Sequence, residues 1–244
     1  MFRTDPNFRI RACQAGIRLV ARLHGWQDVV DGPYTPDRSR LSQAVTELAS
    51  SQVEESAIPS YTHENLLLRA LFQARGNAVL KWISDQARRL MDVGCGAGAL
   101  VETLDTTPKR TVTGIDIAPE AANAYLQPCS QVQILKGDIS HLPLKDNSFD
   151  CIVAMDVLEH FDELERPLSE LSRVISPGGQ LLVTGPTENW MYRVGRRIAG
   201  FSGEYHPKSV HEVGEAVEQL FGKPARKRTI SIGTPLFEVL DYRS

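Results

Sequence analysis

Residues 90–98 read Leu-Met-Asp-Val-Gly-Cys-Gly-Ala-Gly, and this stretch decides how the chain folds. Its first four residues are mostly apolar and predict a short buried strand. Three glycines at alternate positions, Gly94, Gly96 and Gly98, predict a sharp turn into a helix. Glycine lets a ligand approach the main chain, and the free N–H groups at the start of the next helix can bind an anionic group. The turn alone also fits a plain strand-to-helix connection.

The chain on both sides of this turn alternates between strand and helix patterns. Apolar runs rich in Val, Ile and Leu predict strands at residues 90–93, 111–115, 132–135, 149–155 and 180–184. Helices are predicted at residues 99–104, 119–127, 164–175 and 210–221. Strands that alternate with helices favour a parallel sheet covered on both faces. Residues 225–232 and 236–241 predict two further strands, which are close enough in sequence to pair as an antiparallel hairpin.

The first 85 residues differ from this pattern and are predicted to be mostly helical. Apolar side chains at helical spacing predict helices at residues 6–24, 39–53 and 62–84, with Thr62 as the N-cap of the last. No motif in this part indicates a function. We therefore expect a helical N-terminal extension over residues 1–85, which would form a cap, and an α/β domain over residues 86–244.

The composition is that of an ordinary globular protein. Of 244 residues, 42% are hydrophobic and 23% are charged, which excludes a disordered chain, a collagen and a disulfide scaffold. The net charge of -3 argues against a nucleic-acid partner. The four cysteines form no C-x-x-C pair, so we expect neither a redox dithiol nor a metal site. Free thiols and the lack of a secretory signal or a bilayer-length apolar run predict a cytoplasmic location.

An acidic residue stands at the end of each of the next two predicted strands. Asp116 ends the second strand, and Asp138 and Ile139 follow the third. Ligands of open parallel sheets bind outside the carboxyl ends of the strands, where the glycine turn and both acids are expected to meet. A carboxylate at Asp116 can accept hydrogen bonds from ribose hydroxyls. Asp138 suits the amine of an adenine and Ile139 its ring face. Each acid by itself also fits a turn or a surface position.

With these residues in place, the sequence resembles the class I S-adenosylmethionine-dependent methyltransferases. Residues 90–98 look like motif I of that family. Further motifs follow in the family's order and spacing, namely Gly-Ile-Asp-Ile at 114–117, Gly-Asp-Ile at 137–139, Asp-Asn-Ser-Phe-Asp-Cys-Ile-Val at 146–153 and Ser-Pro-Gly-Gly-Gln-Leu-Leu-Val at 176–183. Val-Leu-Glu-His at 157–160 is similar to the type 11 subgroup, which contains ubiquinone, menaquinone and small-molecule methyltransferases. The resemblance covers about residues 89–184.

The resemblance implies a Rossmann-like fold, a seven-stranded and mostly parallel α/β sheet with a C-terminal antiparallel hairpin. It also implies S-adenosylmethionine as the cofactor, with the glycines against its amino acid part. Asp92 would orient the turn or reach the methionine amino group through water, and Asp116 would bind the ribose. The cofactor-binding residues that it implies are Asp92, Gly94, Cys95, Gly96, Gly98, Asp116, Ile117, Asp138, Ile139 and Met155.

The function implied is methyl transfer to an O or N atom of a small, anionic or lipid- or glycan-linked metabolite. A nicotinamide enzyme is a weaker alternative: Gly94, Gly96 and Ala99 fit G-x-G-x-x-A, but no Tyr-x-x-x-Lys is present. A non-catalytic S-adenosylmethionine-binding regulatory or interaction protein is a second alternative, although the glycine turn and the ribose acid are intact. A nucleic-acid or protein methyltransferase is a third, and no Asn-Pro-Pro-Tyr or Asp-Pro-Pro-Tyr motif supports it. The oligomeric state is open.

Catalysis of methyl transfer demands little acid–base chemistry. The sulfonium is an activated leaving group, so the enzyme mainly aligns the acceptor and excludes water. A base matters only for an acceptor that is protonated at neutral pH. His160, after the fourth strand, and His206 with Tyr205, after the fifth, are the candidate catalytic residues because histidine titrates near neutrality. Each histidine also fits an ordinary loop position.

Two stretches combine arginines with apolar side chains at helical spacing. They are residues 189–201, with Trp190 and Arg193, and the predicted helix at 6–24. Either fits an anionic membrane surface, an anionic acceptor or an ordinary solvated helix, so a membrane-peripheral location is included. A later basic run of Lys223, Arg226, Lys227 and Arg228 is expected to be solvated charge on an edge strand.

Overall fold

A computed structural model describes most of the chain after residue 31. The described residues are 32–48, 66–104, 109–126, 132–198, 206–231 and 233–244, together with 18, 19, 21–23 and 25. Most of the predicted helix at 6–24, the N-cap Thr62 and the candidate Tyr205 lie outside these residues. No helix within the described ranges combines the length and the apolar character that a membrane span requires.

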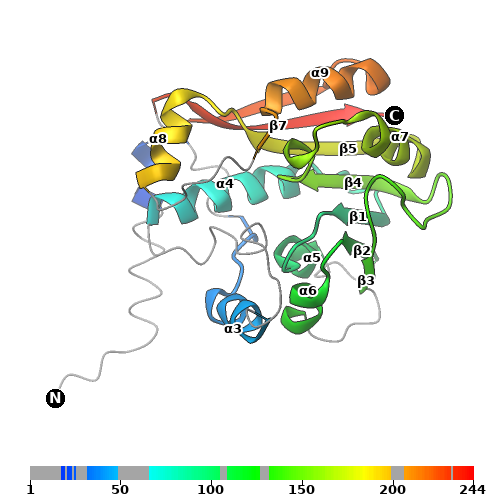
Figure 1. The fold of residues 1–244 in the computed structure, drawn as a ribbon, viewed down its shortest axis with the longest axis horizontal. Helices are drawn as coiled ribbons and strands as arrows, with labels where there is room; N and C mark the ends of the chain where they lie inside the picture. Colours follow the sequence, from blue (N-terminus) through cyan, green and yellow to red (C-terminus); the bar gives the residue numbers. More distant parts are fainter. Residues whose placement is uncertain are drawn as a thin grey trace.

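Seven strands form one sheet in the order β3-β2-β1-β4-β5-β7-β6 (Figure 1). Strands β1 to β5 are parallel to one another, and β7 is antiparallel to both β5 and β6. The predicted α/β sheet with a C-terminal antiparallel hairpin is therefore confirmed. The strands are β1 (Arg89–Val93), β2 (Thr111–Asp116), β3 (Val132–Lys136), β4 (Phe149–Met155), β5 (Ile175–Pro186), β6 (Arg226–Ser231) and β7 (Pro235–Arg243).

Helices cover the sheet on both sides, as Figure 1 shows for α4 and α9. The helices are α3 (Arg38–Leu48), α4 (Leu66–Trp82), α5 (Ala99–Leu104), α6 (Glu120–Tyr125), the short 3₁₀ turn η2 (Leu158–His160), α7 (Glu165–Val174), α8 (Trp190–Ile198) and α9 (Val210–Phe221). Alternate side chains of a strand point to opposite faces. In β4, Cys151 and Val153 join the core beneath α4 and α5, whereas Ile152 and Ala154 join the core beneath α7 and α9. The central strands are buried on both faces for this reason.

Helix α4, from the predicted N-terminal extension, shares the core of the sheet. Ala70, Ala74 and Ala78 of α4 are fully buried. The side chain of Gln180 on β5 fixes the end of this helix, because its amide oxygen accepts from the N–H of Ser84 at 3.0 Å and its Nε2 donates to the Trp82 carbonyl at 2.8 Å. Hydrogen bonds from a side chain of β5 therefore hold the end of α4 against the sheet.

The basic run that ends in β6 is exposed at the edge of the sheet, as expected, and two of its cations also pair with acidic side chains. β6 is an edge strand as expected, but Arg226 Nε lies 2.7 Å from Asp241 Oδ2, and Lys227 Nζ lies 2.8 Å from Glu238 Oε2. Both carboxylates are on β7 and are almost fully buried. The physical reason is that β7 lies between β5 and β6, so its acidic side chains are removed from water and need cations from the edge.

Substitution of Gly76 tests how tightly α4 is packed. A Cβ atom at this position would lie 2.1 Å from the ring of the buried Tyr34, whereas one at Gly214 of α9 would meet the flexible end of Leu240 at 3.3 Å. Alanine gains about 1 kcal/mol of helix propensity over glycine at either site, and overpacking costs about 1–3 kcal/mol. We expect Gly76→Ala to lower the free energy of unfolding in denaturant titrations and Gly214→Ala to leave it unchanged or raised. Equal effects of the two variants would contradict this packing.

Candidate functional site

The glycine turn lies where the strand order reverses, at the carboxyl end of β1. β1 has β2 on one side and β4 on the other, and ligands of open α/β sheets bind at this kind of switch point. Gly94, Gly96 and Gly98 all have φ between 51° and 79°, which favours glycine. A Cβ at Gly94 would collide with Val157 at 2.4 Å, but a Cβ at Gly96 would meet no atom within 4 Å. The turn therefore presents open backbone at Gly96.

The carboxylate of Asp116 holds this turn from the end of β2. Its Oδ2 accepts from the N–H of Gly96 at 2.8 Å, and its Oδ1 accepts from the N–H of Ala118 at 2.9 Å. A carboxylate has about four acceptor positions, so it can still bind two hydroxyl groups. Asp116 remains partly exposed, as a group that meets a ligand must be.

Asp92 and Cys95 lie deeper than Asp116. Asp92 is 3% exposed, and burial together with the neighbouring charge of Asp116 raises the pKa of its carboxyl well above the ordinary value. Burial also raises the pKa of the Cys95 thiol, and this thiol lies against the backbone of β2. Cys95 thus supports the turn from inside. A positive charge on a ligand near Asp92 would favour its ionised form.

The residues predicted for the adenine side differ in exposure. Asp138 is exposed, and its Oδ1 accepts from the N–H of Ser140 at 2.8 Å. Ile139 is only 6% exposed and belongs to the core that also contains Ile115. Ile117, next to Asp116, is 64% exposed and offers the larger apolar surface. Met155, at the end of β4, is partly buried.

These groups fit S-adenosylmethionine in chemistry and in arrangement. The backbone at Gly96 is open to close approach, and the partly exposed Asp116 carboxylate suits ribose hydroxyls. The exposed Ile117 suits the ring of an adenine, and the buried Asp92 carboxyl suits an amino group. The two strand ends that carry these groups, those of β1 and β2, are neighbours in the sheet.

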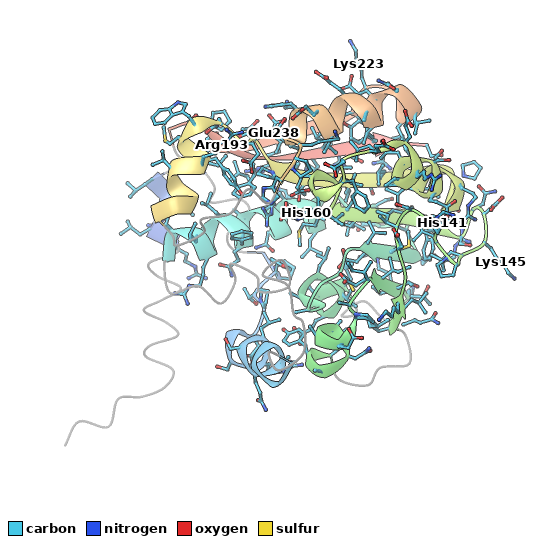
Figure 2. All side chains as sticks on the ribbon, viewed as in Figure 1. His141, Lys145, His160, Arg193, Lys223 and Glu238 are labelled. Atoms are coloured by element: carbon cyan, nitrogen blue, oxygen red, sulfur yellow. The ribbon has the colours of Figure 1, made fainter. Side chains whose placement is uncertain are left out.

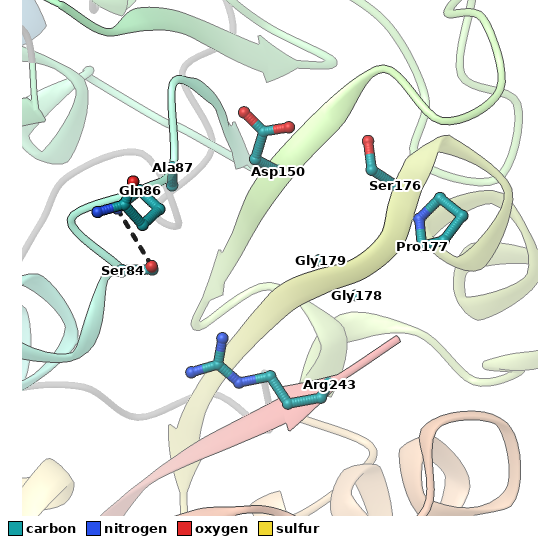
Figure 3. Close-up of a pocket in the computed structure, with 9 residues that line it drawn as sticks. All are labelled: Ser84, Gln86, Ala87, Asp150, Ser176, Pro177, Gly178, Gly179 and Arg243. Atoms are coloured by element: carbon teal, nitrogen blue, oxygen red, sulfur yellow. Dashed lines mark hydrogen bonds between the residues drawn. The ribbon is translucent and has the colours of Figure 1, made fainter.

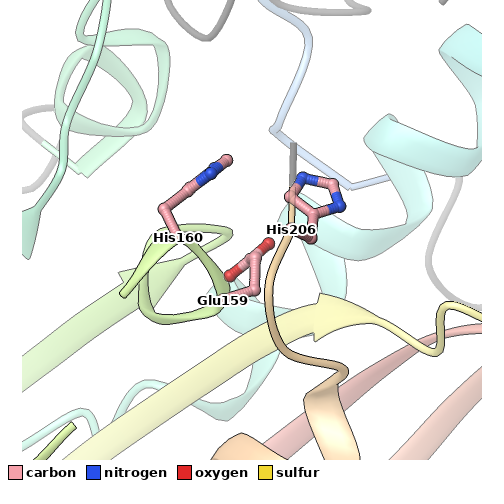
Figure 4. A group of neighbouring side chains, drawn as sticks. All are labelled: Glu159, His160 and His206. Carbon is pink, nitrogen blue, oxygen red and sulfur yellow. The ribbon is translucent and has the colours of Figure 1, made fainter. Parts of the chain in front are cut away.

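A second group of polar side chains gathers beyond β4 and β5, on the expected acceptor side. His160 and His206 lie with ring centroids 4.9 Å apart, although 45 residues of sequence separate them. His206 Nδ1 lies 2.6 Å from Glu188 Oε1. Figure 4 shows that Glu159 and His160 come from η2 and that His206 approaches them from the loop before α9. The structure thus brings together both candidate histidines from the sequence.

Sequence reasoning missed several charged residues of this group. Arg75 of α4 is 1% exposed and forms an ion pair with Asp156, which follows β4. Its guanidinium carbon lies 4.2 Å and 4.4 Å from the ring centroids of Phe72 and Phe237. Asp156 and Glu188 both have positive φ, at 56° and 49°, a strained conformation that often marks functional sites. The position of Asp156 directly after a strand was a signal that the sequence offered for this group. Its partner Arg75 could not be found in the same way, because it lies 81 residues earlier in the sequence.

Glu159 is the most unusual of these side chains. It is 1% exposed, and neither carboxylate oxygen has a hydrogen-bond partner within the described part of the chain. Burial, and secondarily the nearby charge of Asp156, raises the pKa of its carboxyl well above the ordinary value. Buried carboxylates are normally paired or hydrogen-bonded, so this one indicates a local function.

A small hollow of about 140 Å³ lies elsewhere, at the opposite end of the sheet (Figure 3). Asp150, Ser176, Gly179 and Arg243 are among the residues that line it. It lies at the amino ends of β1 and β4, whereas ligands of parallel sheets bind at the carboxyl ends. We therefore place the candidate site at the glycine turn and the histidine pair.

Comparisons with known proteins concern mainly the central part of the chain. Residues 91–183 match the methyltransferase domain family. A demethylmenaquinone methyltransferase of Tropheryma whipplei is 33% identical over 128 residues, which cover 51% of this chain and 53% of that protein. A malonyl-[acyl-carrier protein] O-methyltransferase of Serratia marcescens is 31% identical over 123 residues, with coverages of 50% and 48%. The chain thus spans about half the length of these two curated relatives.

A solved structure extends the likeness of the fold over more of the chain. The N-methyltransferase NodS of Bradyrhizobium japonicum, in complex with S-adenosyl-l-homocysteine, has a TM-score of 0.61 and 18% identity. It covers 84% of this chain, and this chain covers 98% of it. Residues 91–183 thus match a methyltransferase domain, and the fold around them is similar to that of a solved N-methyltransferase.

Proposed function

We propose that this protein transfers the methyl group of S-adenosylmethionine to an O or N atom of a small acceptor. The observation that carries the proposal is the cradle at the carboxyl ends of β1 and β2, where the open backbone of Gly96 and the carboxylate of Asp116 meet. The family of residues 91–183 supports it. Both of the curated relatives are methyltransferases, which supports it further.

The residues of the chain would act mainly by binding and alignment. S-adenosylmethionine supplies a methyl group on a positively charged sulfur, which needs no further activation by the protein. Asp116 would hold the ribose, and Asp92 would bind the amino group in its ionised form. The histidine pair and Glu188 would form the polar wall of the acceptor side, where they orient the acceptor atom.

For the acceptor, we propose a small metabolite with an anionic or lipid- or glycan-linked part, reached from α8. Trp190 is 72% exposed at the start of this helix, and Arg193 one turn later has a 67% exposed side chain. Arg193 Nε lies 3.7 Å from Glu188 Oε2, so this helix adjoins the histidine pair. An apolar and cationic surface of this kind suits a carboxylate or phosphate on an apolar chain. The expected cap formed by residues 1–85 and a cytoplasmic, membrane-peripheral location belong to this proposal.

Asp116→Asn tests the cofactor side. Asparagine keeps the size of the side chain but loses the charge and one of the acceptor oxygens. We expect S-adenosylmethionine binding, measured by calorimetry, to weaken by about 1–3 kcal/mol, or about 5- to 150-fold. Asp146→Asn is the matched control, because its carboxylate is exposed and pairs with Arg173 away from the turn. If the two variants bound S-adenosylmethionine with equal affinity, Asp116 would not be a ribose-binding residue.

The pKa of Asp92 predicts how binding depends on pH. The free protein holds the proton of this carboxyl above the ordinary pKa of about 4, and a bound cationic group favours its loss. Binding therefore releases a proton, and affinity should rise as the pH rises through the raised pKa. Asp92→Asn should flatten this pH dependence in calorimetric titrations. As the pH rises from about 4 to the raised pKa of Asp92, this carboxyl ionises in the unfolded chain but not in the folded one, so the parent loses stability. Asp92→Asn should not show this loss.

Transfer itself can be tested without knowing the acceptor. The protein is incubated with small-molecule extracts and S-adenosylmethionine that carries a trideuterated methyl group. Mass spectrometry should detect a product with the labelled methyl on O or N, and the Asp116→Asn variant should make much less of it. Tight binding of the cofactor with no labelled product from a broad set of extracts would instead favour a non-catalytic regulatory protein.

A further inference from the structure

Glu159, His160 and His206 have the arrangement of metal ligands. Each of the three side chains can offer one ligand atom, and these atoms all lie within 4.8 Å of one another. Glu159 and His160 are adjacent in η2, and the N–H of Lys208, two residues after His206, donates to the Glu159 carbonyl at 3.4 Å. Backbone contact therefore holds the two segments next to each other, as Figure 4 shows. Ligand bonds of about 2.0–2.2 Å need only side-chain shifts from this spacing.

The buried carboxylate of Glu159 is the independent sign of a ligand here. Its two oxygens have no hydrogen-bond partner among the described residues, and the side chain is 1% exposed. The nearest cation on the buried side, Arg75, is in an ion pair with Asp156. Glu188 adds a third carboxylate to the group. Glu159 thus remains without a partner among the described residues, and a cation between its carboxylate and the histidines would supply one.

The position of Glu188 prepares His206 to act as a ligand. Its Oε1 lies 2.6 Å from His206 Nδ1, and the side chains are 10% and 13% exposed. When Nδ1 donates its proton to a carboxylate, Nε2 carries the lone pair and can bind a metal. A carboxylate behind a ligating histidine is the usual partner that orients the ring at metal sites.

We propose that Glu159, His160 and His206 bind a divalent first-row transition-metal ion, with Glu188 as the residue that positions His206. Two imidazoles and one carboxylate suit Zn²⁺, Fe²⁺ or Mn²⁺ better than Mg²⁺, which prefers oxygen ligands and water. The cysteine spacing led us to expect no metal site, and this proposal departs from that expectation. The three ligands come from two segments that only the fold brings together.

The exposure of the ligands indicates what the ion would do. Glu159 is buried, His206 is half-buried and His160 is exposed, so the open coordination positions face the acceptor side. This role rests on the proposed function. A hydroxyl of the acceptor bound there loses its proton to water more readily. Its oxygen then bonds to the methyl carbon while the carbon–sulfur bond breaks, and the sulfur keeps the electron pair as a neutral thioether. The substrate class is thus an acceptor with a metal-binding oxygen.

The test measures metal binding directly, without any acceptor. Zn²⁺ affinity of the full chain is determined by competition with a chromophoric chelator, and Mg²⁺ is the comparison ion. We expect the parent to bind one Zn²⁺ per chain. The affinity for Zn²⁺ should fall more than about 100-fold in His160→Ala and in Glu159→Gln, and about 10- to 100-fold in Glu188→Gln. His160→Ala is the cleanest variant because its side chain is exposed. Zn²⁺ should raise the unfolding temperature of the parent but not of this variant.

Matched controls separate this site from adventitious surface binding. His141→Ala removes an exposed histidine that lies well apart from His160 (Figure 2), and Glu163→Gln removes an exposed carboxylate three residues beyond it. Both should bind Zn²⁺ as the parent does. Equal Zn²⁺ affinity of the parent, His160→Ala and His141→Ala would overturn the site, as would the lack of binding to the parent.

A second readout distinguishes failure of the metal site from failure of the proposed function. The three site variants should bind S-adenosylmethionine like the parent, because they lie outside the cofactor cradle. Intact cofactor binding with no specific metal binding would reject the metal site alone. Specific metal binding by a parent that does not bind S-adenosylmethionine would reject the proposed methyl transfer and leave the metal site standing.

Discussion

The hydrogen bond from the N–H of Gly96 to the carboxylate of Asp116 joins the carboxyl ends of the neighbouring strands β1 and β2. It is possible only because Gly96 adopts a positive φ and because β1 and β2 are parallel neighbours in register. The bond fixes the open backbone of the turn beside the acid that would hold a ribose. Since Asp116 also accepts from Ala118, the carboxylate is rigid before any ligand binds. A preformed cradle of this kind loses little conformational freedom on binding.

On the acceptor side, the main constraint is that acidic side chains are removed from water. Asp156, Glu159 and Glu188 stand close together behind the carboxyl ends of β4 and β5, and one of them is almost without contact to solvent. Arg75 reaches them from α4 between two phenylalanine rings. A helix outside the matched family region therefore contributes a charge to the site. This arrangement ties the N-terminal part of the chain to the chemistry as well as to the core.

Much of the fold could be predicted because its signals are local. The turn at residues 94–98 depends on glycines at defined positions, and every strand of the parallel part of the sheet contains a predicted apolar run. The histidines were also found, since both follow predicted strands. Arg75 and Glu188 were not found, because their roles come from ion pairs across 81 and 18 residues of sequence and from no motif. The exposed basic run was expected, but its ion pairs were not, since its partners lie on the neighbouring strand.

The sequence by itself determined the order of strands and helices, the glycine turn and the acids at the strand ends, because periodicity and backbone preference act within a few residues. Only the tertiary structure decided that Ile117 is exposed while Ile139 is buried, and that Glu159 lies between two histidines without a hydrogen-bond partner in the described residues. Burial and long-range pairing depend on which elements pack together. These properties arise from the whole fold, and no short stretch of sequence contains them.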